Sequence, residues 1–185
     1  MNREWERARD GRLVKRGQQG DAEALGELVE LYHGVIYRMA FRMLGDVDDA
    51  ADVTQITFVR AFEKLHSFRS EHVFFSWLYR IGINQAADWK RRPHDVHGTD
   101  DCLMAQGGDP QSALHQAQIQ DQVQNTVMQL SDEHRAVIVL RHFSECSYDE
   151  ISEILSIPEK TVKSRLFEAR CRLRDLFEGG MGRVE

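Results

Sequence analysis

Hydrophobic residues recur at spacings of three and four through most of this 185-residue chain. That spacing is the period of an amphipathic α-helix, and no stretch shows a convincing strand-like alternation. The pattern therefore predicts an all-α protein. One helix is expected between Asp21, a suitable N-cap, and Gly45, which ends it. The next is expected after Asp46, which begins an acidic turn of the kind that favours a helix N-terminus.

The helical pattern fails between Pro93 and Gln111, where glycine, proline and aspartate gather. A stretch of roughly 20 residues without helical signals is longer than most loops inside a domain, so it predicts a flexible acidic linker between two small helical domains. The expected organisation is an N-terminal extension at 1–20, a helical domain at 21–93, the linker at 94–111, a second helical domain at 112–178 and a tail at 179–185.

The segment from Ser147 to Arg174 predicts two helices joined by a tight turn. Ser147 and Glu150 have the spacing of a capping box, and Pro158 fits only the first turn of a new helix. The second helix has one apolar face and one face with lysines and a hydroxyl, which suits a DNA major groove. A solvated helix hairpin in a bundle is the alternative. The outward residues are Lys160, Lys163, Ser164, Phe167 and Cys171.

An aromatic and basic stretch occupies residues 67 to 92. Aromatic rings beside cations and an Asn suit single-stranded DNA, because bases stack on the rings while the cations follow the backbone. The alternative is a core helix with a solvated basic end. A second, polar face of this helix is expected at Arg80, Asn84, Asp88 and Arg91.

The net charge of −6 argues against a protein that coats nucleic acid non-specifically, because phosphate neutralisation drives such binding. DNA binding is therefore expected through local basic patches, and weakly unless a larger partner helps. No apolar run reaches the roughly 20 residues that span a bilayer, so a soluble cytoplasmic protein without membrane insertion is expected.

The three cysteines form no CxxC pair, so neither a disulfide framework nor a standard zinc site is predicted. His94, His97 and Cys102 leave open a metal enzyme or hydrolase, although no acid/base pair or phosphate loop accompanies them. We expect no metal, no cofactor and no catalytic residue.

Taken in order, these motifs resemble a bacterial sigma factor of the extracytoplasmic-function group, of the sigma-70 family. The stretch DVDDAADVTQITFVRAF is similar to the helix that docks on the clamp coiled coil of the RNA polymerase beta-prime subunit. The resemblance implies core-polymerase binding by Asp49, Asp52, Val53, Gln55 and Phe58.

Two further stretches carry the resemblance. FRSEHVFFSWLYRIGINQAADWKRR is similar to the segment that melts and reads the minus-ten promoter element, and the segment from Leu130 to Arg170 is similar to the reader of the minus-thirty-five element. The implied minus-ten residues are Phe68, Arg69, Phe75, Trp77, Arg80, Asn84, Asp88 and Arg91. The implied minus-thirty-five residues are Lys160, Thr161, Lys163, Ser164, Phe167 and Glu168.

By resemblance, the chain is a non-enzymatic initiation factor that binds core RNA polymerase, through the beta-prime clamp and the beta subunit, and promoter DNA. An anti-sigma factor is a further implied partner. The rival is a stand-alone helix-turn-helix regulator that binds duplex DNA as a dimer. It gives no role to the aromatic stretch.

The chain departs from the family pattern at two informative positions. Ser156 stands where the family often has glycine, so this serine is expected in a left-handed conformation at a cost on the order of 1 kcal/mol. Glu168 stands where the family often has arginine. A carboxylate accepts from a cytosine amino group and repels phosphate, so a different promoter preference is expected.

Overall fold

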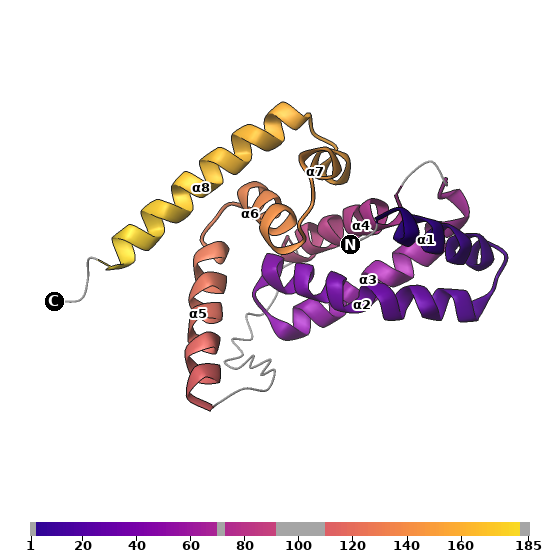
Figure 1. Ribbon diagram of the computed structural model, residues 1–185, viewed down its shortest axis with the longest axis horizontal. Coiled ribbons are helices and arrows are strands. Elements are labelled where there is room, and N and C mark those ends of the chain that lie inside the picture. Colours follow the sequence, from indigo (N-terminus) through magenta and orange to yellow (C-terminus); the bar gives the residue numbers. More distant parts are fainter. Residues whose placement is uncertain (1–2, 70–72, 92–109, 182–185) are drawn as a thin grey trace.

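The computed structural model describes residues 3–69, 73–91 and 110–181, and within these ranges it contains helices and no strand (Figure 1). The all-α prediction with two helical domains is confirmed. The candidate metal residues His94, His97 and Cys102 lie outside the described residues, as does most of the predicted linker.

The first domain is built from helices whose ends carry the expected local signals. Asp21 caps the backbone N–H groups of Glu23 and Ala24, and Gly45 ends the same helix in the left-handed conformation at φ 80°. The Asp46 side chain accepts from the backbone N–H of Asp49. The elements are α1 (Arg3–Gln18), α2 (Ala22–Leu44), α3 (Val47–Lys64), the short 3-10 helix η1 (Leu65–Ser67) and α4 (Phe74–Lys90).

Helix α1 packs into the first domain, which the expectation of a polar N-terminal extension did not foresee. Leu13 and Val14 are buried, and the buried Asp10 carboxylate accepts from the hydroxyl of Tyr32 on α2. The Gln18 side chain donates to the carbonyl oxygens of Leu65 at 2.9 Å and Phe68 at 3.0 Å. Helix α1 thus holds the chain segment that leads into the aromatic helix α4.

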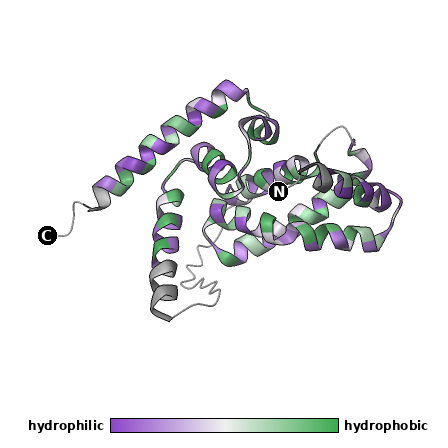
Figure 2. Ribbon diagram, in the orientation of Figure 1, coloured by the Kyte–Doolittle hydropathy of each residue, from purple (hydrophilic) through white to green (hydrophobic). Residues whose placement is uncertain are grey.

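The second domain begins with α5 and ends with the long helix α8, which extends away from the other helices (Figure 1). Hydrophilic and hydrophobic segments alternate along α8 (Figure 2). The elements are α5 (Pro110–Met128), α6 (Asp132–Ile138), the π-helical turn η2 (Val139–Phe143), α7 (Tyr148–Leu155) and α8 (Glu159–Met181).

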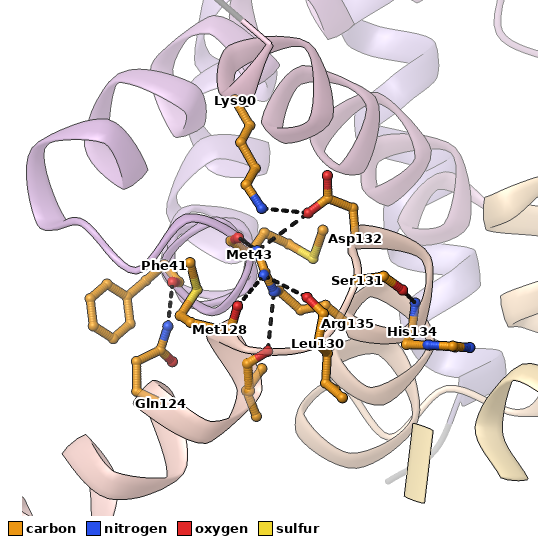
Figure 3. Close-up of polar contacts among 11 residues, drawn as sticks. Phe41, Met43, Lys90, Gln124, Met128, Leu130, Ser131, Asp132, His134 and Arg135 are labelled. Carbon is orange, nitrogen blue, oxygen red and sulfur yellow. Dashed lines mark hydrogen bonds and ion pairs between the residues drawn. The ribbon is translucent and has the colours of Figure 1, made fainter. Parts of the chain in front are cut away.

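The two domains touch where α2 ends, and Arg135 on α6 lies at the centre of that junction (Figure 3). Its side chain is 1% exposed and donates to the carbonyl oxygen of Met43 at 2.7 Å. It also donates to the carbonyl oxygens of Val127, Met128 and Leu130 at the end of α5. Backbone carbonyls at a helix C-terminus lack intrahelical donors, so one guanidinium satisfies the ends of two helices. Burial lowers the pKa of this guanidinium from its ordinary value.

Candidate nucleic-acid interface

The turn between α7 and α8 has the geometry that the sequence predicted. The capping box is present, since Ser147 Oγ accepts from the backbone N–H of Glu150 and the Glu150 carboxylate accepts from the backbone N–H of Ser147. Ser156 is left-handed at φ 54° and ψ 42°, as expected. Helix α8 restarts directly after Pro158, whose carbonyl accepts from the N–H groups of Thr161 and Val162. This is a helix-turn-helix.

Helix α8 presents its predicted DNA face to solvent. Val162, Leu166 and Ala169 are buried and anchor the helix on the second domain. On the opposite side the Phe167 side chain is 69% exposed, and Thr161 is half-buried. The other exposed members of the predicted set are Lys160, Lys163, Ser164 and Glu168.

Ion pairs on α8 moderate the charge of this face. Lys163 Nζ lies 2.8 Å from the Glu159 carboxylate, and this hydrogen bond raises the pKa of Lys163. Glu168 lies 3.4 Å from His134 Nε2 on α6. The Lys163–Glu159 pair is solvent-exposed and the His134–Glu168 pair is partly so, and exposed ion pairs stabilise a fold little.

Aromatic rings between η1 and α4 form a packed cluster. Phe68 is 9% exposed and lies 5.1 Å from the Trp77 ring and 5.8 Å from the Phe74 ring, measured between centroids. The half-buried Phe75 packs on Tyr79 at 4.4 Å. Phe68 is therefore a core residue in this structure.

The polar face of α4 is divided between solvent and the second domain. Asn84, Asp88 and Arg91 are exposed, and Asp88 pairs with Arg91 at 3.5 Å. Arg80 instead donates to the backbone carbonyl of Glu153 on α7. A hollow of about 290 Å³ at this contact is lined by Ser67, Phe68, Arg69, Trp77, Arg80 and Glu153.

The predicted polymerase-binding residues on α3 lie at different depths. Asp52 and Gln55 are exposed and Asp49 is half-buried, whereas Val53 is 0% and Phe58 6% exposed. The two apolar side chains therefore support this face from the core. Sequence reasoning overlooked Val59, which is 53% exposed. Its spacing after Asp52 and Gln55 places it on the same helix face, and that spacing was the available signal.

Two negative findings concern the described residues alone. They contain no group of three or more His, Cys, Asp or Glu side chains arranged to hold a metal ion. Among their helices, none combines the length and the apolar character that crossing a membrane requires.

Two protein families match the chain in the order of its two domains. Sigma-70 region 2 matches residues 28–94, and Sigma-70, region 4 matches residues 120–173. The chain is 36% identical to the ECF RNA polymerase sigma factor SigW of Bacillus subtilis, over 87% of this chain and 92% of that protein. It is 35% identical to the RNA polymerase sigma-H factor of Pseudomonas aeruginosa, over 87% of this chain and 90% of that protein.

A solved structure is similar across both domains. CnrH, in complex with the cytosolic domain of CnrY, is 29% identical with a TM-score of 0.71, and the match covers 92% of this chain and 98% of CnrH. A match of that extent includes both helical domains. The order of the matched regions, the near-complete coverage of the relatives and the helix-turn-helix agree. The chain belongs to the extracytoplasmic-function group of sigma-70 family RNA polymerase sigma factors.

Proposed function

We propose that this chain binds core RNA polymerase and directs promoter recognition, promoter melting and transcription initiation. The observation that supports the proposal is the presence on one chain of two helices that differ in the side chains they carry, each in a different matched region. Helix α4 lies in the Sigma-70 region 2 match and α8 in the region 4 match. Aromatic rings with cations and an amide suit unpaired bases, whereas polar side chains on an exposed helix suit a duplex.

The exposed side of α3 is the proposed contact with the beta-prime clamp. Asp52 and Gln55 provide polar groups around the exposed Val59, and Asp49 lies at their edge. An apolar centre with a polar rim is the usual composition of a protein interface. In this proposal the buried side chains of Val53 and Phe58 contribute indirectly, by packing in the core and fixing the position of α3.

A separate surface on the second domain is the proposed contact with the beta subunit. A hollow of about 460 Å³ between α5 and α8 is lined by residues that include Thr126, Leu176 and Phe177. Phe177 is 37% exposed there. The hollow lies between α5 and the far end of α8, away from the residues expected to face DNA, so both contacts fit one domain.

For the minus-ten element, the proposal assigns base reading to Asn84. Its exposed amide has both a donor and an acceptor for a base edge. An extruded base would rest against the aromatic cluster beside Trp77 and Phe75. Phe68 would support that cluster from the core. The strand backbone would follow Arg69, Arg80 and Arg91, with Asp88 holding Arg91 in place.

For the minus-thirty-five element, the proposal assigns phosphate contacts to Lys160 and Lys163. Thr161 and Ser164 carry hydroxyls at the beginning of α8, where a helix-turn-helix meets base edges. Phe167 suits contact with a thymine methyl group. Glu168 is proposed to accept from a cytosine amino group, which gives this chain a promoter preference of its own.

The chain acts in this proposal as a non-enzymatic factor in the cytoplasm, because RNA synthesis belongs to the polymerase and transcription occurs there. An anti-sigma factor is its proposed regulator. Support comes from the solved relative CnrH, which is in complex with the cytosolic domain of a second protein.

In vitro transcription with purified core polymerase and a panel of promoters tests the function. The chain is expected to start transcripts at a subset of promoters where core polymerase alone starts none. Duplex binding that is equally tight without polymerase, together with no new transcripts, would favour the stand-alone dimeric regulator.

A further inference from the structure

Helix α1 has a basic surface to which the proposed function gives no role. Residues 7–18 contain five cationic side chains and one acidic side chain, Asp10, which is 4% exposed. The Sigma-70 region 2 match begins at residue 28, after this helix has ended. We propose that Arg12 and Lys15 on α1 contact the phosphate backbone of the promoter strand beside the minus-ten element. This inference rests on the proposed function and extends its path for DNA.

Arg12 and Lys15 lie together on the solvent side of α1. Leu13 and Val14 between them are buried and face the first domain. A spacing of three residues places two side chains on the same face of a helix, so Arg12 and Lys15 share the opposite, exposed face. No ion pair joins either of them to another described residue. Both charges are therefore available to a partner.

Two other cations of α1 are held by acidic side chains of the chain itself. Arg9 pairs with the adjacent Asp10 at 2.8 Å. Arg16 pairs with Asp21 at 2.7 Å and with two further carboxylates at the beginning of α2. The positive charge that α1 offers to a partner is therefore concentrated on the face of Arg12 and Lys15.

The C-terminal end of α1 lies against the segment that leads into the proposed minus-ten surface. Helix α1 contacts both η1 and α4 (Figure 1). Gln18, which follows Lys15 by about one turn, donates to the carbonyl of Phe68 at 3.0 Å. The next residue, Arg69, lines the hollow at the start of α4. A strand with a base in this hollow would thus meet Lys15 first and Arg12 one turn further along α1.

Phosphate groups are the partner that this face fits. The whole chain has a net charge of −6, so an exposed face with cations and no carboxylate is a local exception. Lysine and arginine contact phosphates whatever the base sequence, and each contact makes binding weaker at higher salt because counterions are released. The contact is therefore expected to strengthen binding at every promoter that the chain uses, without changing which bases it prefers.

Neutralisation of single cations tests the inference in the complex of the full chain with core polymerase. The variants are Arg12→Gln and Lys15→Gln. The matched control is Arg16→Gln, the same charge change on the same helix at a cation that carboxylates already hold. The affinity for a promoter fragment with a mismatched, open minus-ten element is measured at several salt concentrations. Thermal unfolding verifies that every variant is folded.

Arg12→Gln and Lys15→Gln are each expected to weaken binding at low salt and to lower the salt dependence by about one phosphate contact. Between about 50 and 200 mM salt, each variant should therefore lose about three-fold less affinity than the unmodified chain. Arg16→Gln should keep the original salt dependence. An equal salt dependence of all four proteins would overturn the inference, and so would an equal decrease in all three variants.

An acidic surface of the polymerase is the alternative partner for this face. Binding of the chain to core polymerase without DNA separates the two partners, and Lys15→Gln is expected to bind as tightly as the unmodified chain. Weaker binding of Lys15→Gln in the absence of DNA would overturn the inference in favour of a polymerase contact. Absence of transcripts from the unmodified chain would instead contradict the proposed function.

Neutral methylphosphonate linkages then locate the contact on the strand. Single phosphates on either side of the minus-ten bases are replaced, and each fragment is bound by the unmodified chain and by Lys15→Gln. At the contacted phosphate, the replacement should weaken binding of the unmodified chain and have little further effect on Lys15→Gln, because the same contact is already lost. Additive losses at every phosphate tested would show that Lys15 contacts none of them and would overturn its assignment.

Discussion

Helices α4 and α8 both carry residues expected to face DNA, but the chain presents them in opposite ways. Phe167 on α8 is 69% exposed, whereas Phe68 beside α4 is 9% exposed and Arg80 is engaged by α7. The residues expected to read a duplex are therefore mostly exposed on α8. Those expected to read a single strand are divided between exposed positions on α4, such as Asn84, and the packed aromatic cluster.

The difference follows from the chemistry of the two targets. A duplex is read by polar groups and a few apolar contacts, which tolerate water when no DNA is present. Unpaired bases stack on aromatic rings, and an exposed aromatic cluster is unfavourable in water. Aromatic rings suited to unpaired bases are therefore more favourable in water when they pack on one another, as Phe68, Phe74 and Trp77 do.

The largest expected effect comes from Arg135, the buried residue at the junction of the two domains. Arg135→Met removes a buried guanidinium that serves four backbone carbonyls. Stranded buried acceptors are costly, so the free energy of unfolding is expected to fall by about 3 kcal/mol. Denaturant unfolding measures this change. Arg165→Met, at a half-exposed ion pair with Glu133, is the control, and a similar loss in both variants would contradict the central place given to Arg135.

The second prediction tests whether α4 and α8 act on different promoter elements. Asn84→Ala is expected to lower transcript formation with polymerase by about ten-fold, since a base-edge contact is worth about 1–3 kcal/mol. Binding of the free chain to a minus-thirty-five duplex should not change. Filter binding and run-off transcription measure the two properties. An equal loss in both assays would mean that α4 does not act on a separate element.

The third prediction concerns the base preference of helix α8 at the minus-thirty-five element. Glu168→Arg is expected to change the preferred upstream base several-fold, because it replaces an acceptor by a donor that suits guanine. Selection from a randomised minus-thirty-five library measures the preference. His134→Gln removes the ion-pair partner of Glu168 and leaves its carboxylate in place, so this control should keep the original preference. An unaltered promoter profile in Glu168→Arg would refute the assigned role.

The smallest expected effect is a change in thermal stability from a substitution in the turn between α7 and α8. Ser156 has φ 54°, and Gly at this position removes the Cβ penalty of about 1 kcal/mol. The greater freedom of glycine in the unfolded chain offsets part of that gain, so Ser156→Gly should raise Tm by only a few degrees. Thermal unfolding followed by circular dichroism checks it. A lower Tm would show that the serine side chain stabilises the turn.

Local signals explain why much of the fold could be predicted from the sequence. The caps at Asp21, Gly45 and Ser147 depend on neighbours within four residues, and so does the left-handed Ser156. Helix α8 likewise has the expected buried and exposed faces. The packing of α1 could not be predicted, because it depends on the contact of Asp10 with a tyrosine far along the chain.

The candidate sites were less predictable for the same reason. Lys163 and Phe167 lie on the expected face because helix periodicity alone places them. Periodicity says nothing of the bond between Arg80 and a carbonyl on α7, or of Arg135 at the end of α2. Both contacts join residues more than 70 positions apart, so only the folded chain brings them together.

The two hydrogen bonds from Gln18 have a practical consequence for anyone who shortens this protein. The Sigma-70 region 2 match begins at residue 28, so trimming to that boundary would delete all of α1. The carbonyls of Leu65 and Phe68 would then lose the hydrogen bonds from Gln18, and the first domain would lose a helix that packs on α2. Fragments for crystallisation or binding assays should therefore retain the amino-terminal helix, with any purification tag at the opposite end.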